Sequence, residues 1–420
     1  MSPSAISTSS ATPPKASGLP DNRRPYAELD VTKMLKTLVP EADQLPVPDA
    51  HDPVRLGQNC TTAHMVQVPW SMKTGWGTPV MSPYGKIALE PTASVLHYAT
   101  ESFEGMKAYR GHDNKLRLFR PDLNCARLLK SNARVGLPSF NPSALLAIIT
   151  TFLGTECPRW LPDPGTNIYV RPAMVGSGSA LGINQPPEAL FFLFAALFPQ
   201  SLGGSANAPH PGIKLLASSP EHIRAWPGGF GSAKVGANYG PAMVSHAAAK
   251  AQGCTQTLWL FGEERIVTEA GASNFFVVWK KKGGEGVELV TSSLDTEVIL
   301  DGITRRSVLE VARERLAEGS TAGTELAPLE VVERPFTMSE VVEASEEGRL
   351  VEAFVSGTAM FITPVSGIKY GDTEIQFPMM VTEEGYKTPR SAYSNTIKSW
   401  LEDIIYGRVE HEWGYVVAEE

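Results

Sequence analysis

Residues 228–240 read GGFGSAKVGANYG and place a single lysine, Lys234, among five glycines. Glycine reaches backbone conformations that are closed to other residues and lets the chain approach a ligand closely. A loop of this composition folds tightly and presents one long amine. An isolated lysine in a turn is usually a solvated surface side chain, whereas a lysine that acts as a nucleophile needs a desolvated position that lowers its pKa.

A glycine-rich stretch with a lysine also suggests a nucleotide-binding loop. That loop requires the pattern Gly-x-x-x-x-Gly-Lys-Ser/Thr. Here Ala233 precedes the lysine and Val235 follows it, so the pattern is absent. We therefore interpret Lys234 as a candidate nucleophilic amine.

An acidic residue lies directly before a strongly apolar segment further along the chain. Residues 268–276 read TEAGASNFF, which places Glu269 where a carboxylate is costly unless it has a partner. Two interpretations remain open from these residues. Glu269 caps a turn at the strand entrance, or it keeps a pyridinium nitrogen protonated, which makes pyridoxal an electron sink.

Two short segments have the composition of a phosphate site. Residues 300–306, LDGITRR, open a predicted helix, and the free amides at a helix N-terminus bind phosphate without a charged side chain. Residues 356–359, SGTA, follow an apolar run and supply further amides and a hydroxyl. Each segment alone also fits an ordinary helix start or a strand-to-turn transition.

The composition excludes several classes of function. The 420 residues carry a net charge of −8 and no basic run, which argues against a nucleic-acid partner. The four cysteines match no zinc or disulfide spacing, so we expect reduced thiols and no metal. No apolar stretch approaches the roughly 20 residues of a membrane span. Residues 1–30 have the composition of a mobile tail and not of a signal peptide, which favours the cytosol and leaves a mitochondrial location open.

Segments typical of strands alternate with segments typical of helices, which indicates a mixed α/β fold. We predict strands over residues 115–119, 167–175, 189–198, 214–217, 257–261, 274–279 and 287–291. We predict helices over residues 120–135, 143–153, 241–252, 304–318 and 392–405. Residues 199–211 contain many helix breakers, so we place a linker there between a smaller N-terminal domain, 31–198, and a larger C-terminal domain, 212–420.

Taken together, these segments resemble the class IV pyridoxal-phosphate aminotransferases, and within them the branched-chain amino acid aminotransferases. The resemblance extends from about His64 to Trp413. Besides the Lys234 and Glu269 segments, it rests on residues 97–98 (HY), 103–109 (FEGMKAY), 117–121 (RLFRP), 124–127 (NCAR), 169–172 (YVRP) and 223–226 (IRAW). Several such stretches in the family's order are far more specific than any one of them.

The resemblance implies a fold-type IV enzyme, with a barrel-like sheet in the larger α/β domain and pyridoxal 5'-phosphate at the domain interface. It implies that Lys234 forms the Schiff base and that Glu269 contacts the pyridine nitrogen. The remaining cofactor contacts that it implies are Tyr239 at the phenolic oxygen, and Arg127, the amides of Ile303 and Thr304, and Thr358 at the phosphate. The substrate contacts that it implies are Tyr98, Phe103, Tyr169, Arg171, Thr358 and Ala359.

The implied activity is transamination of leucine, isoleucine and valine with 2-oxoglutarate, by an enzyme that is usually a homodimer. Two departures from the family pattern, Ala63 and Ala272, concern the choice of substrate side chain. A specialised aminotransferase of secondary metabolism, a D-amino acid aminotransferase and an aminodeoxychorismate lyase therefore stay open, as does a non-catalytic protein that retains the fold. Met360 and Thr363 replace the two cysteines of a redox pair that some relatives carry, so we predict no thiol switch.

Overall fold

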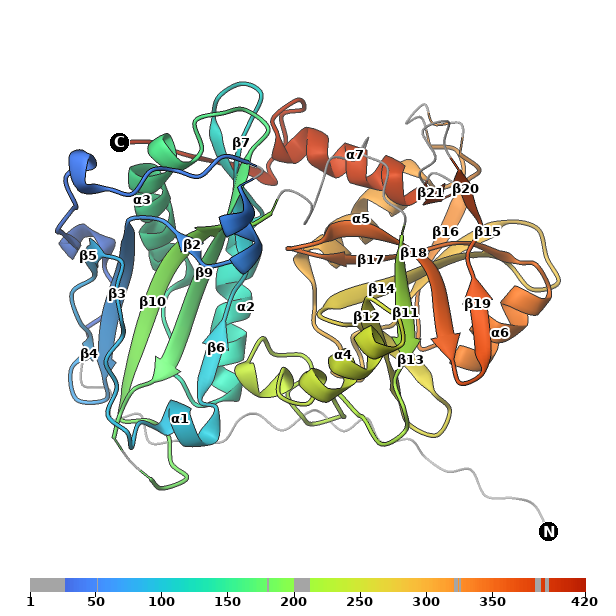
Figure 1. Cartoon of the computed structure of the whole chain (residues 1–420), viewed down its shortest axis with the longest axis horizontal. Helices are drawn as coiled ribbons and strands as arrows, with labels where there is room; N and C mark the ends of the chain where they lie inside the picture. The colour runs from blue at the N-terminus through green and yellow to red at the C-terminus, as the bar shows by residue number, and fades with distance from the viewer. Residues whose placement is uncertain are drawn as a thin grey trace, which may run out of the picture.

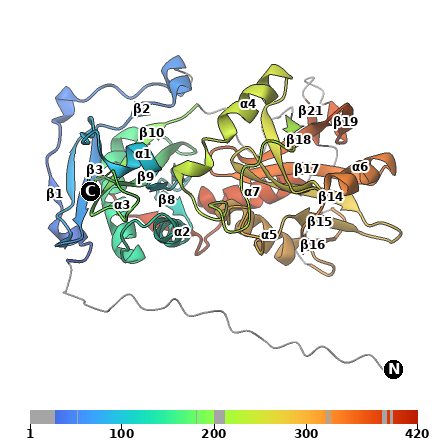
Figure 2. The ribbon, with the colours of Figure 1, turned by 90° about the horizontal axis from the view of Figure 1, so that it is seen from below.

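The computed structural model describes residues 27–50, 52–179, 181–199, 212–320, 324, 326–381, 387–389 and 393–420. Two units, each built around its own β-sheet, lie side by side, and the chain passes from the first to the second after β10 (Figure 1). Figure 2 shows the same arrangement from a second direction.

The first unit is built on a mixed sheet whose main path runs β1-β5-β3-β10-β9-β7-β8-β22. Three further strands join its sides, since β2 pairs with β10, β4 with β3 and β6 with β9. The strands of this sheet are β1 (Leu35–Lys36), β2 (Cys60–Thr61), β3 (His64–Ser71), β4 (Gly75–Trp76), β5 (Val80–Pro83), β6 (Glu101–Phe103), β7 (Met106–Arg110), β8 (Leu116–Phe119), β9 (Asn167–Gly176), β10 (Glu188–Leu197) and β22 (Gly414–Val417).

Two long helices, α2 (Pro121–Arg134) and α3 (Pro142–Trp160), cover one face of this sheet (Figure 1). Their apolar residues join strand residues such as Val68 and Phe191 in one buried core. Asn141 caps α3, since its side chain accepts a hydrogen bond from the amide of Ser143. The short helix α1 (Ser94–Tyr98) and the 3₁₀ turns η1 (Val31–Lys33), η2 (Glu41–Asp43) and η3 (Pro53–Gly57) complete the unit.

The second unit contains a closed sheet. Strands β13, β12, β11, β18, β17 and β14 pair in that order, and β14 pairs back with β13, which closes a six-stranded barrel. Strand β15 extends the sheet from β14, β16 from β15, and β19 from β18. The strands of this sheet are β11 (Ile213–Ala217), β12 (Gln256–Phe261), β13 (Ile266–Ala270), β14 (Ser273–Lys280), β15 (Val287–Thr291), β16 (Leu329–Glu333), β17 (Leu350–Gly357), β18 (Phe361–Tyr370) and β19 (Thr373–Gln376).

Helices pack around the barrel, and their apolar residues join buried clusters with residues of its strands. Helices α5 (Ile303–Arg315) and α7 (Tyr393–Ile405) share one buried cluster with β14 and β17, while α6 (Met338–Glu346) joins the cluster inside the barrel. Helix α4 (Ala242–Ala251), the turn η4 (Gly236–Asn238) and the hairpin β20 (Met379–Val381) with β21 (Lys387–Pro389) complete the unit. Figure 1 shows α7 along one side of the barrel, extending toward the first unit.

The mixed α/β class and the barrel-like sheet are confirmed, and every predicted strand and helix that lies in the described part of the chain is present. The helix predicted over residues 143–153 runs on to Trp160, with Pro158 in its last turn. The predictions omitted α1, α6 and several strands of both sheets. Strands β6 and β7 are too short to show a periodic pattern of their own. They form strands because they pair with β9.

Two of the predicted boundaries differ from the structure. The C-terminal residues do not all belong to the second unit, because Gly414–Val417 pairs with β8 and Val417 is buried in the first core. The mobile tail predicted over residues 1–30 includes residues that pack on the first unit. The amide of Ala27 donates to the carbonyl of Thr74, and Leu29 is buried. Residues 1–26 and 200–211, which include the rest of the tail and most of the predicted linker, lie outside the described residues.

Within the described ranges, none of the helices combines the length and the apolar character that a membrane crossing requires. All four cysteines are free thiols. Ala63, one of the two departures from the family pattern, lies between β2 and β3, where its amide donates to the buried carboxylate of Glu156 at 3.1 Å.

Candidate active site

The Lys234 loop belongs to the second unit and binds to the first. The amide of Lys234 donates to the hydroxyl of Ser131 on α2 at 2.8 Å, and its carbonyl accepts the amide of Phe103 on β6 at 3.1 Å. Val235 and Ser102 form an isolated antiparallel bridge at the same place. The loop is therefore held by backbone contacts between the two units, which position the lysine at their junction.

Aromatic rings surround the amine of Lys234. Its Nζ lies 3.3 Å from the hydroxyl of Tyr239 and 4.8 Å from the centre of the Phe103 ring. The two rings lie 5.2 Å apart between centroids. Asn238 closes the loop beneath them, because its side-chain amide donates to the carbonyls of Phe230 and Ala233. The amine is thus directed between two aromatic side chains by a short, internally bonded loop.

Close packing explains two of the glycines in this loop. A Cβ added to Gly231 would lie 2.7 Å from the carbonyl oxygen of Val298 and 2.8 Å from the Cβ of Ala225. A Cβ added to Gly236 would meet the carboxylate of Glu101 at 1.8 Å. Larger residues at these two positions would displace the loop from the surfaces that hold it.

Glu269 lies on β13 and is almost completely buried. Its Oε1 accepts hydrogen bonds from the amide of Leu300 at 2.9 Å and from the side chain of Asn274 at 3.2 Å. Nη1 of Arg224 lies 2.8 Å from the other oxygen, Oε2, without the alignment of a hydrogen bond. Burial raises the pKa of Glu269, and the Arg224 guanidinium opposes that rise.

The two oxygens of Glu269 therefore differ. Oε1 is fully engaged, whereas Oε2 accepts no hydrogen bond from any residue that the structure describes. A buried carboxylate oxygen in this state is costly unless a donor reaches it. A protonated ring nitrogen is such a donor, so the donor and acceptor chemistry here fits a pyridinium group.

Arg127 extends from α2 toward the start of α5. Its Nε and Nη2 contact both oxygens of the buried Glu104 at 2.8 and 2.9 Å, and its Nη1 donates to the carbonyl of Asp301 at 3.0 Å. Burial acts against the charge of Arg127, but Glu104 outweighs it and raises the pKa of the guanidinium. The structure thus places a permanent positive charge beside the first turn of α5.

Helix α5 begins at Ile303, followed by Thr304, and its N-cap residue, Gly302, has no side chain that could cap the first amides. Gly302 precedes the helix, and a Cβ added there would lie 2.1 Å from the side-chain oxygen of Asn274. Open amides at a helix N-terminus attract anions. With Arg127 bonded to Asp301, this corner combines the two features of a phosphate site.

The turn after β17 approaches the same region from the barrel. The hydroxyl of Thr358 donates to the carbonyl of Gly105 at 3.0 Å, and Nζ of Lys107 donates to the carbonyl of Ala359 at 3.1 Å. Both bonds connect the second unit to residues of the first unit that follow β6. This turn is therefore held next to Glu104 and Arg127.

Arg171 also contacts the Phe103 ring and is bonded to Tyr169. The guanidinium carbon of Arg171 lies 4.5 Å from the Phe103 centroid, and its Nη2 donates to the hydroxyl of Tyr169 at 3.1 Å. Gly105 allows this contact, since a Cβ there would overlap the Tyr169 hydroxyl. The positive charge of Arg171 therefore lies next to Phe103, one of the two rings beside the Lys234 amine.

Tyr98 is the one predicted site residue that the structure does not join to this cluster. It lies at the end of α1, is 39% exposed, and its hydroxyl donates to the carbonyl of Leu181. The structure also adds residues that the sequence reasoning did not single out, namely Arg224, Glu104, Asn274 and Ser131. The arginine in residues 223–226, IRAW, was a signal for the first of these, since a charge beside two apolar residues suggests a buried partner.

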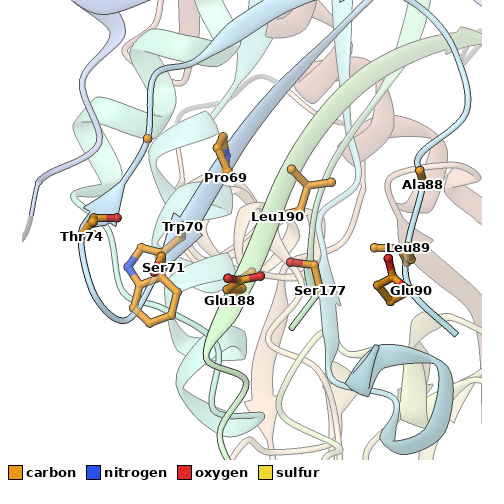
Figure 3. A pocket seen from close by; sticks show the side chains of 13 residues that line it. Pro69, Trp70, Ser71, Thr74, Ala88, Leu89, Glu90, Ser177, Glu188 and Leu190 are labelled. Carbon is orange, nitrogen blue, oxygen red and sulfur yellow. The ribbon is translucent and has the colours of Figure 1, made fainter. Parts of the chain in front are cut away.

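A separate hollow lies away from these residues, on the first unit (Figure 3). It is lined by parts of β3 and β10 and by the segment before α1, and Figure 3 shows Glu188, Ser177 and Glu90 at its walls. Of the predicted site residues it contains none. We therefore assign the reactive chemistry to the Lys234 cluster and not to this hollow.

Comparisons with a family model, with known sequences and with solved structures all indicate the same family. Residues 101–368 match the family model described as Amino-transferase class IV. The chain is 40% identical over 356 residues to the mitochondrial branched-chain-amino-acid aminotransferase of Schizosaccharomyces pombe, covering 84% of this chain and 78% of that one. It is 36% identical over 394 residues to the cytosolic enzyme of Saccharomyces cerevisiae, covering 94% and 99%.

Among solved structures, the fold is similar to the branched-chain amino acid aminotransferase of Thermobaculum terrenum in its PLP-form, the holo-form. The TM-score is 0.61 at 20% sequence identity, over 85% of this chain and 99% of that one.

Proposed function

This chain belongs to the class IV aminotransferase family, and we propose that it transfers the amino group of leucine, isoleucine and valine to 2-oxoglutarate, giving branched 2-oxo acids and glutamate. The relatives named above carry the name of this activity. The observation that carries the proposal is the amine of Lys234, which lies beside Phe103 and Tyr239, together with the buried carboxylate of Glu269 on β13.

The family, together with a solved relative in its PLP-form, implies pyridoxal 5'-phosphate. When bound, this cofactor supplies an aldehyde that takes up the amino group and a ring that withdraws electrons from it. Oε2 of Glu269 supports the assignment, because it pairs with Arg224 yet accepts no hydrogen bond from the described residues, and so offers an acceptor for the ring N–H. Arg127 and the amides of Ile303 and Thr304 would hold the phosphate, and Tyr239 the phenolic oxygen. The Thr358 hydroxyl would join them on turning from the carbonyl of Gly105.

The residues of this chain divide the remaining work. With the cofactor bound, Nζ of Lys234 would attach to it at rest and, once released, would accept the proton from the substrate Cα and deliver it to the carbon of the cofactor that takes up the amino group. Tyr239 lies within hydrogen-bond distance of that amine and orients it. Glu269, which Arg224 favours in its ionised form, would hold a proton at the ring nitrogen of the cofactor.

Substrate recognition would need one pocket for an aliphatic and for an acidic side chain. Phe103 and Tyr169 supply an apolar wall, and Arg171 supplies a cation at its edge. The amides of Thr358 and Ala359 would bind carboxylate oxygens. Tyr98 remains a prediction, since its hydroxyl is bonded elsewhere in the single chain, and so does the homodimer.

A substrate panel tests the activity. L-leucine, L-isoleucine and L-valine with 2-oxoglutarate should each give glutamate. The kinetics should be ping-pong, since the first product leaves before the second substrate binds. Faster turnover of D-alanine, or formation of pyruvate from aminodeoxychorismate, would assign one of the alternative class IV activities instead. Turnover confined to another aliphatic amino acid would indicate a specialised enzyme of secondary metabolism.

Lys234→Ala tests the lysine assignment. We expect turnover to fall by about 10³-fold or more, and borohydride reduction to leave no cofactor on the peptide that carries residue 234. Lys250→Ala is the matched control, because Lys250 is exposed on the neighbouring helix α4. Full turnover in Lys234→Ala would disprove the role. A wild-type protein that shows neither turnover nor a reducible cofactor would be the non-catalytic alternative.

A further inference from the structure

Helix α2 of the first unit contacts the Lys234 loop of the second unit at two places. The first is the hydroxyl of Ser131, which accepts the amide of Lys234 at 2.8 Å. The second is Arg134, the last residue of α2. Its Nη2 donates to the carbonyl of Gly228 at 2.7 Å and its Nε donates to the carbonyl of Gly229 at 3.2 Å. The proposed function so far assigns no role to this arginine.

Three residues of α2 that bear on the site lie on one face of the helix. Arg127, Ser131 and Arg134 follow one another at spacings of four and three residues, which brings side chains to the same side of a helix. Arg127 is bonded beside the first turn of α5, where the phosphate would lie. The same face therefore carries the proposed phosphate ligand and both attachments of the loop. A shift of the loop along α2 would change the distance between Lys234 and Arg127.

The contacts of Arg134 suit an arginine in particular. A basic residue in the last turn of a helix commonly donates to carbonyls of its own helix. Arg134 instead binds two consecutive carbonyls of the other unit, and its guanidinium carbon lies 4.6 Å from the centre of the Phe230 ring. A planar guanidinium reaches two neighbouring acceptors and stacks on a ring, whereas the compact ammonium of a lysine does neither as well.

From Phe230 the hydrogen bonds continue to the lysine. The carbonyl of Phe230 accepts the amide of Ala233 at 2.9 Å and the side-chain amide of Asn238 at 2.9 Å. The loop is therefore a short, internally bonded turn that is attached to α2 at its start and at Lys234. Losing the contact with Arg134 would loosen the start of this turn and, through these bonds, the orientation of Lys234.

Arg134 is exposed to solvent, although it contacts a loop that leads to the site. Polar contacts of exposed side chains contribute little to the global stability of a protein. Local order is a separate quantity, because a loop opens at a lower free energy than the core around it. Removal of this side chain should thus change the order of the loop more than the stability of the whole chain.

We propose that Arg134 is a positioning residue, which holds the loop at residues 228–230 so that the amine of Lys234 keeps a fixed place relative to Arg127. The ordering of the loop stands independently of the proposed function, whereas the effect on turnover rests on it.

Hydrogen–deuterium exchange of the full chain, followed by mass spectrometry, tests the ordering. Arg134→Met keeps an apolar contact with Phe230 and removes both donors, so peptides that span residues 229–234 should exchange about tenfold faster or more. Arg134→Lys should exchange nearly as fast as Arg134→Met, because its ammonium does not reproduce the planar fork. Lys130→Met is the matched control, since it removes a charge from an exposed position on the same helix, and it should exchange as the wild type does.

Steady-state kinetics with L-leucine and 2-oxoglutarate test the effect on turnover. Arg134→Met should lower kcat by about tenfold and change the KM for L-leucine by less than about twofold, because Arg134 holds the lysine and is not a substrate contact. Its Tm should stay within about 2 °C of the wild type, which separates a positioning role from a loss of folded protein.

Unchanged exchange of residues 229–234 in Arg134→Met, or an increase that is equal over the whole chain, overturns the positioning role. Wild-type exchange in Arg134→Lys overturns the assignment to the two-carbonyl fork. Faster exchange of the loop with a wild-type kcat overturns the effect on turnover. A wild type without transamination disproves the proposed function, and the exchange experiment then still decides whether Arg134 orders the loop.

Discussion

At the scale of single residues, the pair formed by Arg224 and Glu269 controls the charge of the site. Burial raises the pKa of Glu269, so an isolated carboxylate here would tend to stay protonated. A protonated carboxyl could not hold a proton on a ring nitrogen. The guanidinium 2.8 Å away favours the ionised form, which makes Arg224 a positioning residue for the proposed reaction.

Arg224→Met tests this role. Without the guanidinium the pKa of Glu269 rises further, so more of it is protonated near neutral pH and kcat falls by about tenfold or more. Raising the pH should restore part of the activity, which shifts the acid limb of the kcat profile to higher pH. The measurement is kcat between about pH 5.5 and 9.5, with Arg224→Lys as the variant that retains the charge. An acid limb in the Met variant that coincides with that of the wild type would contradict the prediction.

At the scale of elements, packing makes the Lys234 loop depend on glycine at position 231 and not at position 240. Gly231 lies against two backbone carbonyls, of Glu297 and Val298, whereas a Cβ on Gly240 would have no atom within 4 Å. The segment that Gly231 contacts leads to Leu300, whose amide holds Glu269. A displacement at Gly231 would therefore reach the carboxylate through the chain.

Gly231→Ala should destabilise the protein by about 1–3 kcal/mol through overpacking and should also lower kcat. Gly240→Ala is the matched control in the same loop and should change the free energy of unfolding by less than about 0.5 kcal/mol. Denaturant unfolding and steady-state kinetics measure the two effects. Equal behaviour of the two variants would show that packing against residues 297–298 does not hold the loop.

At the scale of the whole molecule, the last strand, β22, attaches the C-terminal residues to the first unit by pairing with β8. Val417 on β22 is 4% exposed in the first core, whereas its neighbour Val416 is 49% exposed. Val417→Ala should lower the free energy of unfolding by about 2 kcal/mol, because it leaves a cavity in that core. Val416→Ala should be nearly neutral. Two equally small effects in denaturant melts would mean that β22 contributes little to the first unit.

Lys107 connects the two units through its bond to the carbonyl of Ala359. Burial is the main cause that lowers its pKa from 10.5 to about 8. Between these two pH values the unfolded chain binds the proton and the folded protein does not, so this group adds stability as the pH rises from about 8 to 10.5. Below pH 8 the buried charge carries its full cost.

We therefore expect the free energy of unfolding of the wild type, relative to Lys107→Met, to increase by about 3 kcal/mol across this interval. Chemical denaturation at pH 7, 8, 9 and 10 measures the difference. The comparison removes the titration of groups common to both proteins. A difference that stays constant with pH would show that Lys107 titrates normally in the folded state.

Much of the fold could be predicted from the sequence, because hydrophobic periodicity and turn residues are local. They predicted the mixed α/β class and long elements such as α2, β9 and β10. They did not predict β22 as part of the first unit, because pairing between residues about 300 apart leaves no periodic signal near either strand.

For the candidate site, the sequence by itself determined which groups are available: one lysine among glycines, a carboxylate before a strand, and an arginine in a motif. The tertiary structure decided which of them meet. It placed Arg224 beside Glu269, bonded Arg127 to Glu104, and left Tyr98 on an exposed helix end. Such meetings depend on how two units pack, and packing is a property of surfaces that form only after distant segments have come together.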